Sequence, residues 1–135
     1  MNFLLDQPVT ANIETTLYKV TIQWRNGILI ADEPATVGGQ DLGPDPYTLF
    51  LSSLAACTLS TLRMYIDRKG WEIPSISINL NMYQTVDGTV TTHIVRNLQF
   101  DQTITEEQKE RLLLIAKKCP ISKILENNII INTAI

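Results

Sequence analysis

Two cysteines, Cys57 and Cys119, are the residues of this sequence whose chemistry points most directly to an activity. A cysteine thiolate can attack a peroxide and become a sulfenic acid, and a second thiol can condense with that acid to form a disulfide. Cys57 lies within a long apolar stretch, and Cys119 directly precedes Pro120. One thiol on a rigid buried helix and another at a helix break is the arrangement that an attacking and a resolving cysteine require. The alternative is that both are buried, inert thiols.

The stretch around Cys57 is predicted to be a helix over residues 46–69. Pro46 suits the first helical position, Asp45 can cap it, and Gly70 ends it. Apolar side chains surround nearly its whole girth, which places it in a core or at a subunit interface. Cys57 lies too deep for the helix N-terminus to favour a thiolate, so an activating cation must come from elsewhere in the fold.

The surroundings predicted for the two thiols differ. The face of Cys57 is mostly apolar with a few hydroxyl groups, and such a wall suits an apolar substrate. Cys119 follows a predicted helix, and if Pro120 opens a further helical turn, Cys119 is its cap and its thiolate is favoured there. The hydroxyl residues on the face of Cys57 are Ser53, Ser60 and Thr61.

The elements that must position these cysteines are hairpins and helices. Asn26-Gly27 and Asp87-Gly88 are predicted hairpin turns, and Thr105 with Gln108 has the form of a helix capping box. The order predicts an α+β fold in which antiparallel hairpins pack on the long helix. Alternating patterns predict strands over residues 18–24, 28–31, 75–82, 89–100 and 129–131, and helices are predicted over 105–118 and 121–126.

Composition limits the classes of function. The 135 residues are 44% hydrophobic and 19% charged, which predicts one globular domain over residues 1–135 with a loose arm at residues 1–12. The net charge of −3 makes nucleic acid an unexpected partner. The apolar run at 49–62 is expected to be too short and too mixed to span a membrane. No secretory signal is visible, so a cytoplasmic location is expected. One histidine and no paired ligand spacing predict no metal site.

Two segments of the chain together resemble the OsmC/Ohr family, and the likeness covers residues 15–135. The first runs from Gly38 to Thr58 as GGQDLGPDPYTLFLSSLAACT and joins a glycine-rich loop, an Asp-Pro helix start and a cysteine. The second, CPISK at residues 119–123, is similar to the family's Cys-Pro-Val-Ser-Lys motif. Two motifs at the expected separation, each with a cysteine, are more specific than either alone.

The resemblance implies an intertwined homodimer that reduces organic hydroperoxides to alcohols. It implies that Cys57 is the attacking thiolate and Cys119 the resolving thiol. The substrate would be a small hydrophobic hydroperoxide, taken in preference to hydrogen peroxide. An external dithiol reductant such as a lipoylated protein would reduce the disulfide, with no metal or bound cofactor.

One position departs from the peroxidase branch of the family. There, a glutamate follows the helix-start proline and pairs with an arginine that activates the thiolate, whereas this chain has Tyr47. A tyrosine is neutral at pH 7 and cannot hold an arginine by charge. The sequence is similar instead to an OsmC-like side branch with Gly-Pro-Asp-Pro-Tyr, whose activity is less uniform.

Two arginines are candidates for the activating cation. Arg25 ranks first because it roughly matches the family's N-terminal arginine, although a solvated turn residue is the alternative. Arg96 ranks second, because it lies on the apolar face of its predicted strand and an inward arginine needs a partner. Arg63 is expected to point away around the long helix. Asp32 and Glu33 could hold an arginine in place of the missing glutamate.

Three functions are therefore open. The first is a thiol peroxidase, supported by Cys57 and Cys119 in matching motifs. The second is a small-molecule binding or redox-relay protein with weak or no peroxidase activity, supported by Tyr47. The third is a structural dimer in which the thiols do nothing. The rate at which the thiols react with organic hydroperoxides separates the first two, and the third predicts that Cys57→Ser changes nothing measurable.

Overall fold

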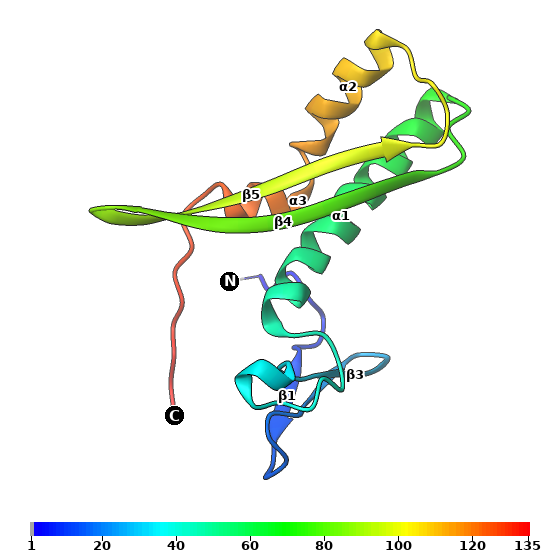
Figure 1. Ribbon diagram of the computed structural model, residues 1–135. Coiled ribbons are helices and arrows are strands. Elements are labelled where there is room, and N and C mark those ends of the chain that lie inside the picture. Colours follow the sequence, from blue (N-terminus) through cyan, green and yellow to red (C-terminus); the bar gives the residue numbers. More distant parts are fainter. Residues whose placement is uncertain (1) are drawn as a thin grey trace. The chain divides into compact units, whose positions relative to one another are not determined.

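The computed structural model describes residues 2–135 and contains two compact units. The first ends at Phe50 and the second runs from Leu51 to Ile135, so that the boundary falls near the start of the long helix. Figure 1 shows the order of the elements along the chain. Both cysteines belong to the second unit.

The N-terminal unit is built on a three-stranded antiparallel sheet. Its strands are β1 (Thr10–Ile13), β2 (Val20–Trp24) and β3 (Gly27–Ala31), with β2 in the middle. The predicted turn at Asn26-Gly27 is shifted by one residue, because Gly27 pairs with Trp24 and leaves Arg25 and Asn26 as the turn. A short 3-10 helix, η1 (Ala35–Val37), follows the sheet.

Strand β1 was not predicted from the sequence. Residues 10–12 of the expected loose arm pair with residues 21–23 of β2. All four side chains of β1 are exposed. The strand therefore lacks the alternation between apolar and polar residues by which a half-buried strand is recognised.

A buried carboxylate organises the glycine-rich loop that follows β3. Asp32 is 2% exposed, and its oxygens accept hydrogen bonds from four backbone N–H groups. Burial opposes the charge, but these donors outweigh it and lower the pKa of Asp32 below its ordinary value. The loop also approaches β3 closely, because a Cβ on Gly43 would lie 2.1 Å from the carbonyl oxygen of Ile30. The donors to Asp32 are Tyr18, Glu33, Gln40 and Leu42.

Asp32→Asn is expected to destabilise the protein at neutral pH and to have less effect in acid. When folding lowers the pKa of a carboxyl group, the group stabilises the fold at pH values above its ordinary pKa of 3.8. This stabilisation is lost as the pH falls through the lowered pKa of the folded state. The variant also turns an amide NH2 toward N–H donors that it cannot accept from. Urea unfolding at about pH 7 and about pH 3 measures the difference. Asp6→Asn at an exposed position is the control, and an equal loss in both variants would contradict the role of Asp32.

The C-terminal unit combines the long helix with a long hairpin and two shorter helices. The helix α1 and the strand β5 have the predicted bounds, and β4 extends further than predicted. The two strands pair antiparallel over their whole length, and Gly88 takes the positive φ of 72° that the tip of the hairpin requires. Figure 1 shows this hairpin, labelled β4 and β5, beside α1 and α2. The elements are α1 (Pro46–Lys69), β4 (Ile76–Asp87), β5 (Thr89–Phe100), α2 (Glu106–Ala116) and α3 (Pro120–Leu125).

The two shorter helices begin as the sequence predicts. Thr105 and Gln108 form the capping box at the start of α2. Cys119 is the N-cap of α3, and Pro120 occupies its first turn. The predicted strand at residues 129–131 is wrong, because within residues 2–135 no other strand pairs with this segment and its isoleucines remain exposed.

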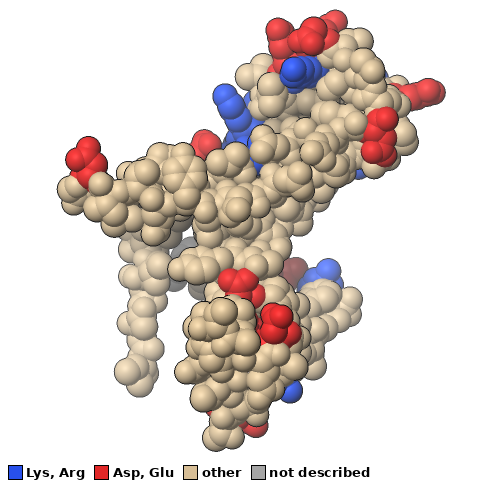
Figure 2. Space-filling model, viewed as in Figure 1, with Lys and Arg blue, Asp and Glu red and all other residues tan. Residues whose placement is uncertain are grey.

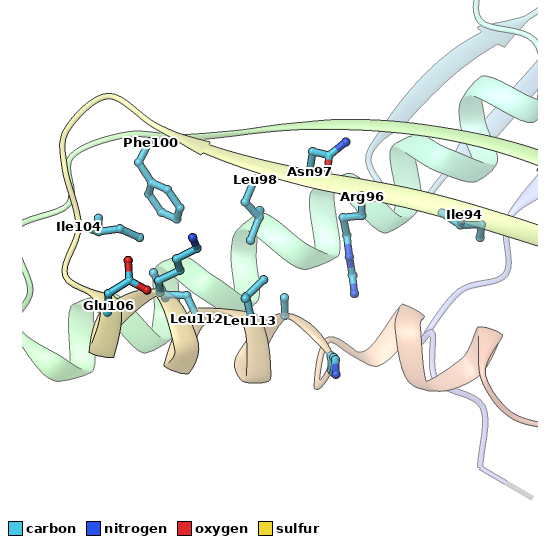
Figure 3. Close-up of a pocket in the computed structure, with 12 residues that line it drawn as sticks. Ile94, Arg96, Asn97, Leu98, Phe100, Ile104, Glu106, Leu112 and Leu113 are labelled. Atoms are coloured by element: carbon cyan, nitrogen blue, oxygen red, sulfur yellow. The ribbon is translucent and has the colours of Figure 1, made fainter.

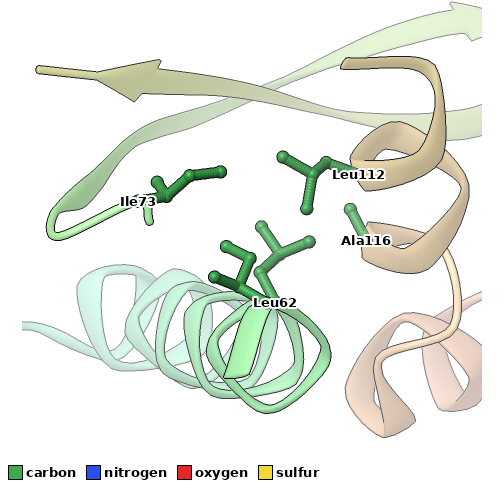
Figure 4. Close-up of a cluster of buried hydrophobic side chains, with 5 residues drawn as sticks. Leu62, Ile73, Leu112 and Ala116 are labelled. Atoms are coloured by element: carbon green, nitrogen blue, oxygen red, sulfur yellow. The ribbon is translucent and has the colours of Figure 1, made fainter. Parts of the chain in front are cut away.

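The core of the C-terminal unit lies where α1 meets α2 and the start of β4. Its five buried members are almost fully shielded from solvent, and Figure 4 shows Leu62 facing Ile73, Leu112 and Ala116. The spacing of the buried positions on α1 is four residues, which is one face of a helix. The core residues are Leu62, Ile66, Ile73, Leu112 and Ala116.

The opposite face of α1 remains partly open. Phe50 is 42% exposed and Met64 is 64% exposed, so the girdle of apolar residues is not fully buried within one chain. By length and composition α1 could cross a membrane, which corrects the expectation that this stretch is too short. The core helix of a globular protein passes the same test, and the packing of Leu62 and Ile66 in the core fits that description.

Candidate thiol site

The site joins the middle of α1 to the N-terminus of α3. Cys57 is half-buried on α1, and its Sγ accepts a hydrogen bond from the backbone N–H of Ile121 at 3.5 Å. The next residue on α1, Thr58, is fully buried and lies 3.8 Å from the Sγ of Cys119. The first turn of α3 therefore contacts α1 beside both thiols.

Cys119 is completely buried, and Ser122 is its principal partner. Its Sγ lies 3.2 Å from the hydroxyl of Ser122 and accepts the Ser122 backbone N–H at 3.3 Å. The second contact is the N-cap interaction of α3, made here by sulfur. The arrangement gives the Cys119 sulfur two donors when it is ionised.

The two thiols affect each other's acidity in opposite directions. Burial has the largest effect on Cys57 and raises its pKa, the Ile121 N–H lowers it, Cys119 raises it again and Thr61 lowers it, and the net shift of the pKa is upward. Burial also opposes the ionisation of Cys119. There, however, hydrogen bonds from Ser122, Cys57 and Thr58 outweigh it and lower the pKa of Cys119. Cys119 is therefore the more acidic thiol of the pair.

Arg96 supplies the positive charge of the site. Its Nη1 donates to the Thr58 hydroxyl at 2.9 Å and to the Ser122 hydroxyl at 2.8 Å. These are the two hydroxyl groups that contact Cys119. The arginine that the sequence predicted to point inward from an apolar strand face thus has two neutral hydrogen-bond partners. Each partner lies between the guanidinium and the sulfur of Cys119.

The other sequence-predicted residues lie in the N-terminal unit or on the outer face of α1. Arg25 occupies the β2–β3 turn with its guanidinium 5.8 Å from the ring centre of Trp24, and its role as the activating cation stays a prediction. Tyr47 is 73% exposed in the first turn of α1. Asp32 serves the backbone of the glycine-rich loop rather than an arginine. Arg63 pairs with Asp67, which is the one ion pair found within residues 2–135.

A groove of about 670 Å³ runs between β5 and α2 and has Arg96 among its lining residues. Figure 3 shows Arg96 and Leu98 extending from β5 toward α2, with Phe100, Ile104 and Leu112 around the far part of the groove. Its wall is mainly apolar, and Lys109, Lys117 and Glu106 add charges. Such a lining suits an apolar molecule that carries a polar group.

Charge and metal-binding groups are sparse in the described chain. On the face shown in Figure 2, lysine and arginine side chains are scattered and form no continuous patch. Within residues 2–135, no three His, Cys, Asp or Glu side chains gather in a way that could hold a metal ion.

Sequence reasoning missed the two hydroxyl residues that join Arg96 to Cys119. Thr58 directly follows Cys57, but a threonine beside a cysteine carries no signal of its own. Ser122 belongs to the CPISK motif, whose likeness to the family motif gives this serine no role of its own. Its position three residues after an N-cap could have identified it, because the N–H at that position is the one that a cap accepts.

Comparison with known proteins gives a family and a fold. The model of the OsmC family, described as OsmC-like protein, matches residues 38–134. This range contains both cysteines, Arg96, Thr58 and Ser122, and begins after Arg25. No curated protein matches the sequence.

Solved structures similar to this one include three bacterial proteins. An OsmC-like protein from Mycoplasma pneumoniae is 22% identical, with a TM-score of 0.73 over 90% of this chain and 89% of that chain. The organic hydroperoxide resistance protein of Bacillus subtilis is 22% identical, with a TM-score of 0.67 over 93% and 94%. An organic hydroperoxide resistance protein from Legionella pneumophila is 20% identical, with a TM-score of 0.66 over 94% and 93%. These similarities establish the fold.

Proposed function

Because this chain belongs to the OsmC family, we propose that it is a thiol peroxidase that reduces organic hydroperoxides to alcohols. The observation that carries the proposal is the interacting pair of free thiols, Cys57 and Cys119, on neighbouring helices. Two of the similar structures are described as organic hydroperoxide resistance proteins, which supports the same activity.

The difference in burial between the two thiols supports Cys57 as the residue of the first step. Cys57 is half-buried, whereas Cys119 is fully buried and cannot meet a substrate without a local opening. The thiolate of Cys57 attacks the outer oxygen of the hydroperoxide, and the O–O bond breaks. The alkoxide leaves and takes up a proton to become the alcohol, and Cys57 becomes a sulfenic acid.

Cys119 then resolves the sulfenic acid. Its thiolate attacks the sulfur of Cys57, the S–S bond forms, the S–O bond breaks, and the leaving hydroxide is protonated to water. The lowered pKa of Cys119 supports this role, since the attacking group must be a thiolate. An external dithiol of the lipoyl type returns two electrons and is itself oxidised to a disulfide.

The test is the rate of thiol loss. Reduced protein mixed with cumene hydroperoxide is expected to lose both free thiols within seconds, roughly tenfold or more faster than with hydrogen peroxide. The rate should rise with pH without reaching a plateau at pH 9.0, because the pKa of Cys57 is raised above that ordinary value. Cys57→Ser is the control. Thiols that persist for many minutes with either peroxide would contradict the proposal.

We further propose that the active form is a cytoplasmic homodimer. The incompletely buried girdle of α1, with Phe50 and Met64 exposed, supports a second copy as its partner. Size-exclusion chromatography with light scattering measures the assembly. A monomer at micromolar concentration would contradict this part of the proposal.

A second candidate is a binding or redox-relay protein with slow peroxidase chemistry. Two observations favour it, the raised pKa of Cys57 and the exposed tyrosine at position 47. A thiol with a raised pKa has little thiolate at neutral pH and reacts slowly. Slow reaction with every peroxide, together with reversible oxidation by a disulfide exchange partner, would favour this candidate.

A further inference from the structure

We propose that Arg96 is a positioning residue that stabilises the thiolate of Cys119 through the hydroxyl of Ser122, and so makes Cys119 the leaving group when the disulfide is reduced. The proposal rests on the proposed function, because it concerns the reductive half of the same cycle. It assigns the reductant's attack to the sulfur of Cys57.

The contacts form a continuous path from the guanidinium to the sulfur. Arg96 Nη1 donates to both hydroxyls at 2.9 and 2.8 Å, and the hydroxyls lie 3.8 and 3.2 Å from the Sγ of Cys119. Thr58 is fully buried and Ser122 is 4% exposed, so the path is shielded from water. Shielding strengthens the effect of the charge on the sulfur.

Each of the two hydroxyl groups has one hydrogen, and the acceptor of that hydrogen decides which hydroxyl can donate to the Cys119 thiolate. The Thr58 hydroxyl gives its hydrogen to the carbonyl of Leu54 at 2.7 Å. The Ser122 hydroxyl oxygen accepts from Arg96 and, while Cys119 is a thiol, from its S–H, and the described hydrogen bonds hold no acceptor for the hydroxyl's own hydrogen. Its hydrogen is therefore directed to Cys119 once that sulfur is an anion, in addition to the Ser122 backbone N–H.

The charge of Arg96 is not neutralised by a carboxylate within residues 2–135, where the one ion pair is Arg63 with Asp67. The charged and titratable groups around the path come from every neighbouring element. Cys57 faces Cys119 from α1, Glu126 after α3 shares a pocket with Arg96 and Ser122, and the groove beside Arg96 adds three more groups. These three are Glu106, Lys109 and Lys117.

Reduction of the disulfide then has a preferred direction. The reductant's thiolate attacks the half-buried sulfur of Cys57, the S–S bond breaks, and its electron pair leaves on Cys119. A disulfide breaks faster toward the thiol of lower pKa, because that thiol is the better leaving group. The second thiol of the dithiol attacks the mixed disulfide and releases Cys57, which takes up a proton.

The first test is the titration of Cys119 alone. In Cys57→Ser protein the ultraviolet absorbance of the remaining thiolate gives its pKa directly. Arg96→Gln in this background is expected to raise the midpoint by about one unit or more, and Arg96→Lys to restore part of it. Arg63→Gln is the matched control and should leave the midpoint unchanged. An unchanged midpoint in Arg96→Gln would overturn the proposal.

Ser122→Ala tests the path without touching the arginine. It removes the hydroxyl but keeps the backbone N–H, and it is expected to raise the Cys119 midpoint in the same direction. Because both residues act along one path, the double variant with Arg96→Gln should shift the midpoint by less than the sum of the single shifts. Additive shifts would overturn the coupling, and an unchanged midpoint in Ser122→Ala alone would overturn the path without any change to Arg96.

The second test locates the attack. Protein oxidised with diamide is treated with a chromophoric monothiol, and peptide mapping identifies the cysteine that carries the mixed disulfide. The adduct is expected on Cys57, and an adduct mainly on Cys119 would overturn the assignment. Neither test uses a peroxide, so failure of the peroxidase activity would be seen separately from failure of this proposal.

Discussion

Replacing Cys57 with serine is expected to slow the reduction of organic hydroperoxides by at least about a thousandfold, because no other described thiol is accessible to the substrate. Cys119→Ser is expected to behave differently. It should retain the first turnover, since Cys57 can still form a sulfenic acid, and then stop. Without a resolving thiol the sulfenic acid is exposed to further oxidation to sulfinic acid.

Two readouts distinguish the variants. A single-turnover assay measures alcohol formed per protein, and intact mass after excess peroxide measures the oxidation state of the remaining cysteine. The expected pattern is no alcohol from Cys57→Ser, one equivalent from Cys119→Ser, and repeated turnover from the unmodified protein when a dithiol is present. Loss of the first turnover in Cys119→Ser but not in Cys57→Ser would reverse the two assignments.

Leu112→Ala is expected to have the largest effect on stability, about 2–5 kcal/mol in the free energy of unfolding. Leu112 is 1% exposed and packs in the cluster where α2 meets α1, as Figure 4 shows. Its removal leaves a cavity between Leu62 and Ile73 that the surrounding elements can close only in part.

The neighbouring leucine provides the control. Leu113 is 52% exposed on the same helix, so Leu113→Ala changes the same residue type with nearly the same helix propensity but little buried surface. A change below about 0.5 kcal/mol is expected there. Urea unfolding of both variants measures the contrast, and similar losses would mean that the core is not where the structure places it.

Patterns that act locally along the chain allowed much of the fold to be predicted. The bounds of α1 follow from Pro46 and Gly70, and the start of α2 follows from the Thr105 and Gln108 capping box, because each signal acts on adjacent backbone groups. The prediction of a last strand at residues 129–131 was wrong. A strand needs a neighbouring strand to pair with, and no strand within the described chain pairs with this segment. β1 was missed because its pairing with β2 is what makes it a strand, while its exposed side chains show no apolar pattern along the sequence.

The thiol site was predicted only in part, and the reason is distance along the chain. The helix break at Pro120 indicated Cys119 as a cap, and the structure confirms that it caps α3. The link from Arg96 to Ser122 and Thr58 joins three elements, and no spacing within any one of them encodes it. The sequence ranked Arg25 above Arg96 by likeness to a family position, whereas Arg96 is the arginine that donates to Ser122, whose hydroxyl lies beside the Cys119 sulfur.

The sulfur of Cys119 also caps α3, so one atom serves both the chemistry and the helix. An anionic sulfur accepts the Ser122 N–H strongly, and a sulfur bonded in a disulfide accepts it weakly. Losing a cap costs a helix roughly 0.5–2 kcal/mol, and α3 has only 6 residues. Within the proposed cycle, the order of residues 120–125 is therefore thermodynamically linked to the oxidation state. Each reduction of the disulfide would stabilise the helical conformation of this segment, and each oxidation would destabilise it.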